Sequence, residues 1–413
     1  MQPNQAIRSK EELINHFSSP QKLEILDLEQ MENLLEMNVQ PELWEDASKR
    51  NLFSFSQQYV QQTKEFKFYG RSIEYIYLVS FLTNLTELNL SGNKISDISS
   101  ICKLKNLKKL YLTYNYVEDI SALLFLTDLI FLNLCQNQLT SYTLALPNLV
   151  ELSLDYNKLR EISGLQHSPQ LESLNLAGTE IVDLCNISQL LNLKSLILGN
   201  NNITEISHLS NFVDLQILEL NNNKQLQNIG PLKFCTQLTQ LSISTTSVVD
   251  IWPLQFLKNL ITLNIGYTQV VDLHPLQNLY RLEKISAYNA CIIDICSLSK
   301  LTQLKELNFR NNKITNTETL KTLKHHDNLS QYDFSDQQVP TTDELQFYSK
   351  ILSVHSSHKQ IRKIQYEKSV PKFRESITHK KEYINLKINE QIQVMNMKIE
   401  IWTQFIQNSY ADQ

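Results

Sequence analysis

Residues 82–104 read LTNLTELNLSGNKISDISSICKL, and closely similar stretches recur along the chain. Residues 104–126 read LKNLKKLYLTYNYVEDISALLFL, and residues 168–190 read SPQLESLNLAGTEIVDLCNISQL. In their apolar positions all three follow the pattern L-x-x-L-x-L-x-x-N-x-I-x-x-I, with further apolar residues at intervals of three. Recurrence at a fixed period is the signature of a protein built by stacking one structural unit.

The repeat extends through the middle of the chain. Most copies are 22 residues long, and the exceptions are one of 20, one of 23 and one of 25 residues. A degenerate copy with Phe66, Phe68 and Ile73 precedes them. Random clustering of apolar residues would not keep phase over this distance. The first leucine of each copy is Leu85, Leu107, Leu129, Leu149, Leu171, Leu193, Leu215, Leu238, Leu260, Leu282, Leu304 and Leu329.

Each copy predicts a short strand followed by a tight return path. The alternating residues Leu88 and Leu90 indicate a strand with one buried face. The spacing of three in Ile95, Ile98 and Ile101 favours a 3₁₀-like or extended turn, since the path is too short for a long helix. A single copy buries too little apolar surface to fold alone, so stacked neighbours must complete each hydrophobic face.

The pattern resembles the leucine-rich repeat, in the 22-residue subfamily found in a regulatory subunit of protein phosphatase 1 and in bacterial internalins. The resemblance covers residues 63–340. It implies an α/β fold: a leucine-rich-repeat solenoid of about 12 repeats, with a curved parallel sheet on the concave side and short 3₁₀ or extended turns on the convex side. The same repeat serves many unrelated partners, so it is specific for the fold and not for the function.

The ninth position of most copies is an asparagine, as at Asn93 and Asn201. The sheet turns there, and an amide side chain satisfies both a backbone donor and a backbone acceptor. Three copies keep a hydroxyl (Thr179, Thr246 and Thr268), whereas Ala290 keeps no polar group. We therefore expect a locally weaker ladder at Ala290.

The two ends differ from the repeat. Residues 1–62 predict a helical N-terminal cap, starting from a capping-box pattern at Ser9–Glu12. One ambiguity is that SPQKLEILDL at 19–28 imitates the start of a repeat. Residues 341–413 predict a helical C-terminal region that contains a basic amphipathic helix.

The last predicted helix carries an apolar stripe with heptad-like spacing from Ile388 to Ile406. Either it packs back on the end of the solenoid, or it forms a short coiled coil with itself or with a partner, and the pattern does not separate the two. Residues 358–387 hold nine Lys or Arg against three Glu. A solvated helix face accounts for them, and binding to an acidic protein, a membrane surface or RNA is the alternative. The charges are not interleaved with an aromatic stacking platform, which argues against RNA.

The composition excludes several function classes. The chain has 413 residues, a formal charge of -5 and only 7 glycines, none placed to form a phosphate-binding loop. We find no catalytic motif, no metal-site motif and no cofactor motif, and we expect no nucleic-acid partner. Six cysteines, no signal-like start and no long apolar run lead us to expect a cytoplasmic protein with free thiols and no membrane span. Cys185 and Cys296 are expected to be buried as small apolar residues.

The concave face is therefore the expected site of a non-catalytic, scaffold-type function. Its predicted columns are mostly Asn, Ser and Thr, and aromatic residues interrupt them in two places. Exposed Tyr, Phe and Arg are common anchors of protein interfaces. The first group is Tyr111, Tyr114, Phe131, Glu151, Asp155 and Tyr156, and the second is Tyr267, Tyr288 and Arg310.

We expect these residues to bind a protein partner. The resemblance to the regulatory subunit of protein phosphatase 1 implies a phosphatase-regulatory role. The resemblance to the internalins implies instead an adhesin. A cytoskeletal or membrane tether that uses the basic C-terminal helix is a third possibility.

Overall fold

The structure is a computed structural model. It describes residues 10–13, 23–25, 28–42, 53–55, 57–315, 319, 322–323 and 326–338. The expected C-terminal helices, 341–413, lie outside these residues. The chain divides into two compact units, Met1–Glu180 and Ile181–Gln413.

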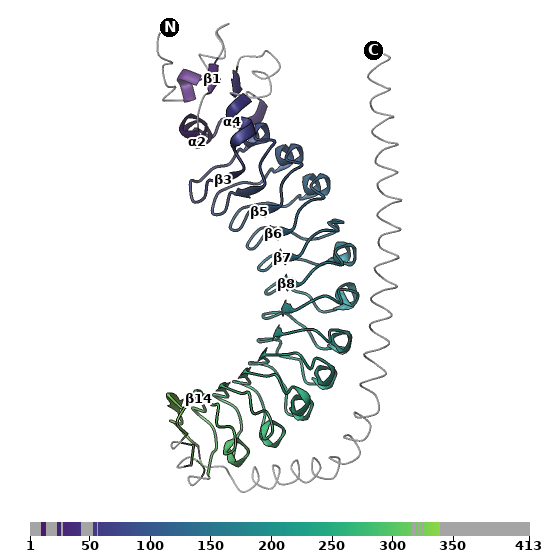
Figure 1. The fold of residues 1–413 in the computed structure, drawn as a ribbon, viewed down its shortest axis with the longest axis vertical. Helices are drawn as coiled ribbons and strands as arrows, with labels where there is room; N and C mark the ends of the chain where they lie inside the picture. Colours follow the sequence, from purple (N-terminus) through teal and green to yellow (C-terminus); the bar gives the residue numbers. More distant parts are fainter. Residues whose placement is uncertain are drawn as a thin grey trace. The chain divides into compact units, whose positions relative to one another are not determined.

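Each unit contains a parallel sheet of three-residue strands, one from each repeat (Figure 1). Neighbouring strands pair in register, so that Leu88 lies beside Leu110 in the first unit and Leu241 beside Leu263 in the second. These central residues are buried, as the alternation predicts. The first unit holds β3 Glu65–Lys67, β4 Glu87–Asn89, β5 Lys109–Tyr111, β6 Phe131–Asn133, β7 Glu151–Ser153 and β8 Ser173–Asn175. The second holds β9 Ser195–Ile197, β10 Ile217–Glu219, β11 Gln240–Ser242, β12 Thr262–Asn264, β13 Lys284–Ser286, β14 Glu306–Asn308 and β15 Gln331–Asp333.

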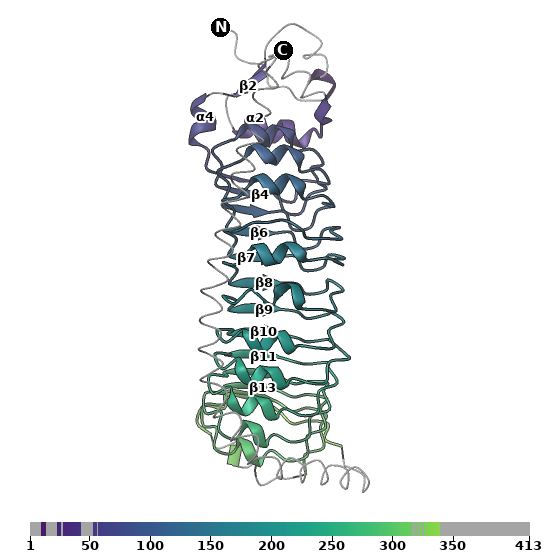
Figure 2. The same cartoon turned by 90° about the vertical axis from the view of Figure 1, so that its right-hand side faces the viewer.

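The return paths contain the predicted 3₁₀ helices, which lie on the opposite side of each coil from the strands (Figures 1 and 2). An acidic side chain often precedes the helix and accepts its first free N–H: Asp97 Oδ1 lies 2.7 Å from the Ser99 nitrogen. The first unit has η1 Tyr77–Phe81, η2 Ser99–Lys103, η3 Ser121–Phe125 and η4 Ser163–His167. The second has η5 Cys185–Ile187, η6 Ser207–Asn211, η7 Gly230–Phe234, η8 Trp252–Phe256, η9 His274–Leu276 and η10 Cys296–Leu298. The predicted leucine-rich-repeat solenoid is confirmed.

The ninth-position asparagines form the expected ladder between coils. The Oδ1 of Asn93 accepts the N–H of Ile73 in the preceding coil at 3.1 Å. Its Nδ2 donates to the carbonyl oxygens of Phe68 and Leu90 at 2.9 Å. Each amide thus satisfies donors and acceptors that the turn would otherwise leave buried. The same pattern of bonds recurs at Asn115, Asn137, Asn157, Asn223 and Asn312.

The N-terminal segment differs from the helical expectation. It contains α2 Leu28–Glu36 and α4 Gln57–Gln62, but also two strands, β1 Leu23–Ile25 and β2 Phe53–Phe55, which pair in parallel. Both strands have an apolar residue at each end of a three-residue alternation, and that pattern favours a strand. The resemblance of 19–28 to a repeat start was therefore the better guide for β1.

The copy that starts at Leu129 is two residues shorter than its neighbours, and no 3₁₀ helix forms between η3 and η4, where every residue is described. Its return path forms a single bridge from Ser141 to Glu161 and buries the whole side chain of Tyr142. The next coil approaches this backbone closely, because a Cβ on Gly164 would lie 2.5 Å from the Leu144 nitrogen. Only glycine fits at that contact.

Candidate functional site

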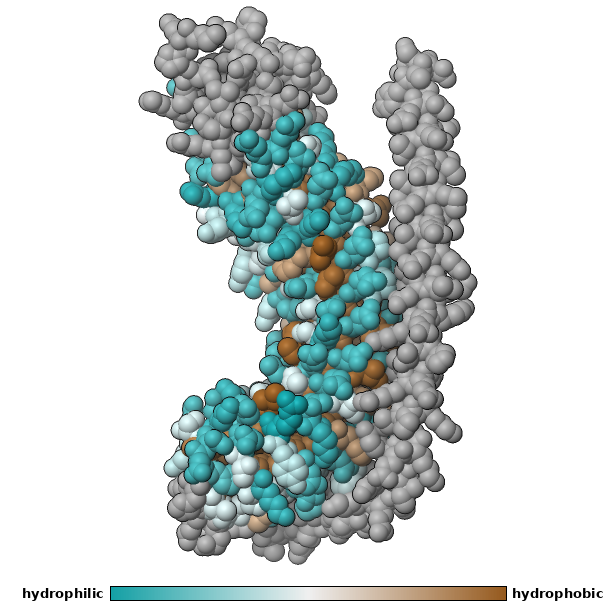
Figure 3. All heavy atoms as spheres, in the orientation of Figure 1, coloured by the Kyte–Doolittle hydropathy of each residue, from teal (hydrophilic) through white to brown (hydrophobic). Residues whose placement is uncertain are grey.

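The first and third residues of each strand point away from the core and form what we call the sheet face of each unit. In β4 these are the half-buried Glu87 and Asn89, on either side of the buried Leu88. Figure 3 shows a mostly hydrophilic surface on which hydrophobic residues form small separate groups. The third residue of most strands is Asn or Ser, so the aromatic Tyr111 at that position of β5 is a local exception on the sheet face.

Tyr111 and Phe131 meet on the sheet face of the first unit, as predicted. Their ring centroids are 4.6 Å apart, with the rings tilted by 36°. The contact is a diagonal one, because in the register of β5 and β6 Tyr111 pairs with Asn133 and Phe131 pairs with Lys109. Aromatic rings at this separation attract each other beyond their buried area. Both rings are half-buried, and the Glu151 side chain beside them is exposed.

Charged residues cover the strands on one side of this aromatic pair. Lys67 forms ion pairs with Glu65 at 2.9 Å and with Glu87 at 3.0 Å. Hydrogen bonds to these two carboxylates raise the pKa of Lys67. Lys109 lies 3.8 Å from Glu87. The charges on β3 to β5 therefore largely neutralise each other.

Tyr114 and Tyr156 do not lie on the strands. They occupy the turn that follows each strand, and their φ angles are 57° and 54°. The backbone N–H of each donates to the next coil, to Cys135 O at 3.0 Å and to Ala177 O at 2.7 Å respectively. The same bond to the next coil is made at the equivalent position of most copies, where the turn is left-handed. The other residues at this position, all with positive φ, are Gly92, Gln136, Gly178, Asn200, Asn222, Thr245, Tyr267, Asn289, Asn311 and Asp336.

The left-handed conformation is unfavourable for a bulky residue. It costs about 1–2 kcal/mol for most L-residues, while glycine and asparagine tolerate it. Despite that cost, Tyr114 and Tyr156 expose 61% and 51% of their surface, although the Tyr156 ring packs against Gly178 of the next coil. An exposed strained residue is a reason to look for function.

Asp155 does not belong to the exposed surface. It is 8% exposed, and it accepts hydrogen bonds from Ser153 Oγ and from Cys135 Sγ, the latter at 3.0 Å. Burial, together with the neighbouring Asp155 carboxylate, raises the pKa of Cys135 to about 12. The structure thus assigns Asp155 to the support beneath the turn, whereas Glu151 remains accessible.

The second unit brings Tyr267 and Tyr288 together. The rings meet edge to face, with centroids 5.1 Å apart. A Cβ on Gly266 would lie 2.6 Å from the Tyr288 ring, so this glycine makes room for it. Arg310 is engaged elsewhere, since its Nε lies 2.7 Å from an Asp336 carboxylate oxygen. Both side chains of this ion pair remain exposed, so Arg310 stays accessible at the surface.

The structure also exposes surfaces that the sequence analysis missed. Leu124 and Phe125, at the end of η3, are 46% and 56% exposed. A groove of about 800 Å³ runs along η6, η7 and η8, and its apolar lining includes Pro231, Phe234 and Phe256. Both lie among the 3₁₀ helices, where the spacing of three indicates burial and does not show which residues remain outside.

The expected burial of Cys185 and Cys296 is wrong, because both side chains are exposed. Each is the first residue of its 3₁₀ helix and follows the buried Leu184 or Ile295. The apolar position is one residue earlier than assumed. Other copies place a serine at the position of these cysteines: Ser99, Ser121, Ser163 and Ser207.

Comparison with known proteins identifies the repeat. A family model described as leucine-rich repeats in two copies matches residues 83–124 and 191–233. An internalin of Listeria monocytogenes is similar to the chain at 31% identity, with a TM-score of 0.65, over 70% of this chain and 85% of that structure. A leucine-rich-repeat protein of Leptospira interrogans shares the fold at 21% identity and a TM-score of 0.58, over 84% of this chain and 92% of its own.

Among curated proteins, no sequence matches the chain at a significant level. Within the described residues, no helix is both long enough and apolar enough to span a membrane. The fold and the similar structures support a protein-interaction scaffold in general.

Proposed function

Because the chain belongs to the leucine-rich-repeat family, we propose that it is a non-catalytic scaffold that binds a protein partner through the sheet face and turn edge of its first unit. The contact residues are Tyr111, Phe131, Glu151, Tyr114 and Tyr156. We call them the aromatic surface. Tyr267 and Tyr288 form a second, smaller contact in the other unit.

The observation that carries the proposal is the strain at Tyr114 and Tyr156. Other copies place Gly, Asn or another polar residue at this turn position, and Tyr267 is the remaining aromatic there. Both tyrosines are more than half exposed, so a large part of each ring is available for contact. Tyrosine offers a large amphipathic contact area with few rotatable bonds, which suits a binding surface.

The aromatic surface also indicates the chemistry of its partner. Tyr111 and Phe131 form a half-buried apolar centre, and Glu151 adds an exposed negative charge beside it. The matching surface carries an apolar or aromatic anchor with a Lys or Arg at its rim. Because stacked coils hold these side chains in place, binding loses little backbone entropy.

An affinity capture with the full chain tests the proposal. The test variant combines Tyr111→Ala, Phe131→Ala and Tyr156→Ala, and the expected result is loss of a specific protein that the unchanged chain recovers. The matched control is Tyr280→Ala, which removes a tyrosine of similar exposure (56%) away from the sheet face. Thermal unfolding of each variant establishes that folding is retained.

Recovery of the same partner by the folded triple variant would contradict the proposal. Equal loss in the Tyr280→Ala control would also contradict it, because binding would then not depend on the aromatic surface.

A surface adhesin is the second candidate, and the similarity to an internalin favours it. We propose a cytoplasmic scaffold, and the two differ in where the chain is found. Protease treatment of intact cells separates them: an adhesin is digested from outside, whereas a cytoplasmic scaffold is digested only after lysis.

A further inference from the structure

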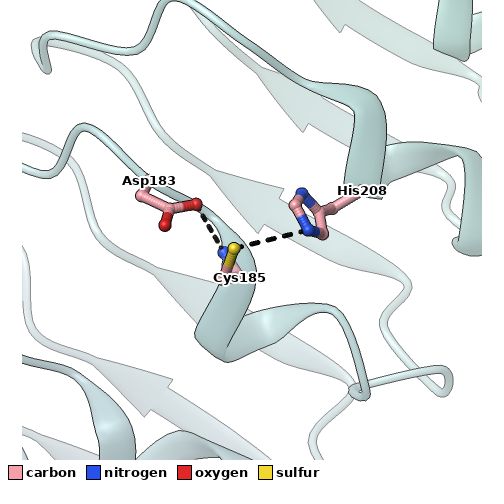
Figure 4. Close-up of side chains that lie close together, drawn as sticks. All are labelled: Asp183, Cys185 and His208. Atoms are coloured by element: carbon pink, nitrogen blue, oxygen red, sulfur yellow. Dashed lines mark hydrogen bonds between the residues drawn. The ribbon is translucent and has the colours of Figure 1, made fainter.

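Asp183, Cys185 and His208 bring three metal-ligating side chains together on the 3₁₀ side of the second unit (Figure 4). One ligand atom from each lies within 4.8 Å of the other two. The Sγ of Cys185 is 3.5 Å from Nε2 of His208. Asp183 and Cys185 flank the start of η5, and His208 is the second residue of η6 in the next coil.

The repeat itself accounts for one member of this cluster. Asp183 Oδ1 accepts the backbone N–H of Cys185 at 2.9 Å, as Asp97 and other acidic residues do ahead of their own 3₁₀ helices. His208 has no such explanation. At its position other copies have residues that are not usual zinc ligands: Ser100, Ala122, Gly164, Asn186, Pro231, Pro253, Pro275, Ser297 and Thr319.

The distances fit zinc. Zn²⁺ prefers four tetrahedral ligands, with bonds of about 2.3 Å to sulfur and about 2.0–2.1 Å to a histidine nitrogen. Two such ligands lie about 3.5 Å apart in a tetrahedron with these bond lengths. The Cys185–His208 separation already equals that edge. A carboxylate oxygen of Asp183 lies within 4.8 Å of both of these atoms.

We propose that Asp183, Cys185 and His208 form a Zn²⁺ site with three protein ligands and an open fourth position. Asp183 and Cys185 are exposed and His208 is half-buried, so the ion would sit at the surface. The open position would be filled by water or by a ligand atom of another molecule. A thiolate, an imidazole and a carboxylate suit Zn²⁺ better than Mg²⁺ or Ca²⁺, which prefer oxygen ligands.

The chain contains its own control. Asp294, Cys296 and Thr319 occupy the equivalent positions around η10, where Asp294 likewise accepts the Cys296 N–H at 2.9 Å. There the Cys296 Sγ lies 3.2 Å from a threonine hydroxyl and not from an imidazole. This second cluster has the same cap and the same thiol but lacks the nitrogen ligand.

Titration of the full chain with Co²⁺, a spectroscopic substitute for Zn²⁺, tests the site. We expect one equivalent to produce a sulfur-to-cobalt charge-transfer band that Zn²⁺ abolishes. Cys185→Ser and His208→Ala should remove the band, and Cys296→Ser should leave it unchanged. Asp183→Asn keeps an oxygen to cap η5 and should weaken binding at least tenfold. Thr319→His should create a second equivalent at the control cluster.

Alkylation of the unchanged chain gives an independent readout that needs no variant. Zn²⁺ should slow the modification of Cys185 by iodoacetamide, measured by peptide mass spectrometry, and should leave Cys296 unaffected. Equal rates at Cys185 with and without Zn²⁺ would overturn the proposal. So would a cobalt band that survives Cys185→Ser.

Discussion

Tyr114 and Tyr156 show how a single backbone angle points to function. The turn after each strand has positive φ because its N–H must reach the carbonyl of the next coil. The sequence analysis selected both tyrosines as interface residues but placed them on the strands. Their conformation could not be read from the repeat, because the same position holds Gly, Gln, Asn, Thr and Asp elsewhere.

Replacing Tyr114 with asparagine should stabilise the fold and weaken partner binding. Asparagine tolerates the left-handed conformation, so the free energy of unfolding should rise by up to about 1 kcal/mol. The matched control is Tyr116→Asn, at a tyrosine of 50% exposure two residues later without a positive φ. Denaturant unfolding measures both, and an equal effect of the two substitutions would show that strain at Tyr114 is not the cause.

Ala290 lacks the polar side chain that the other full copies carry at this position, and we keep the prediction that the ladder is weaker there. In copies with an asparagine at this position, its oxygen accepts the N–H of a residue in the preceding coil, as Asn312 does for Ile292 at 3.1 Å. Alanine offers no oxygen to Val270 at the matching position. The nearby carbonyls already accept bonds, since Asn312 donates to Ala287 and Thr268 donates to Ile265. The missing interaction is therefore an acceptor for Val270.

We accordingly expect amide exchange around Ala290 to be faster than around Asn201, with Val270 the most affected. Ala290→Asn should slow it and stabilise the unit by about 1 kcal/mol. Hydrogen exchange measured by NMR or mass spectrometry provides the test. Equal protection from amide exchange around Ala290 and Asn201 would contradict the prediction of a weaker ladder at Ala290.

At the scale of the elements, the strands and 3₁₀ helices follow from spacing alone. Strict alternation gives one buried residue per strand, and the spacing of three gives the return path. The N-terminal segment was harder, because β1 and β2 are too short to show more than one alternation. The exposure of the Cys185 and Cys296 thiols was not predicted, because the buried apolar position of the repeat lies one residue before each cysteine.

The close approach of η4 to the short copy before it leads to a further prediction. Gly164→Ala should destabilise the first unit by about 1–3 kcal/mol, because the added methyl meets backbone atoms of 143–144 at 2.5–2.6 Å. The control is Gly230→Ala, where the new methyl meets only the Asn228 side chain, at 3.0 Å. Thermal unfolding compares the two, and equal melting temperatures would show that the backbone at Gly164 yields easily.

At the scale of the molecule, the repeat predicts the architecture and leaves the partner open. The stacked coils bury the leucines of the repeat, so the leucine pattern in the sequence predicts the fold. The outward-facing strand residues are mostly Asn, Ser and Thr. They indicate a binding site only where other residue types replace these. Tyr111 and Phe131 could be placed together from the register, whereas the burial of Asp155 and the pairing of Arg310 depend on side chains from other coils.

Hydrogen–deuterium exchange of the chain with and without its captured partner tests the central claim most directly. We predict added protection at β5, β6 and β7 and at the turns that contain Tyr114 and Tyr156. The 3₁₀ helix η3 and the groove along η6 to η8 should exchange as before. Protection confined to those 3₁₀ segments, with β5 to β7 unchanged, would contradict the account.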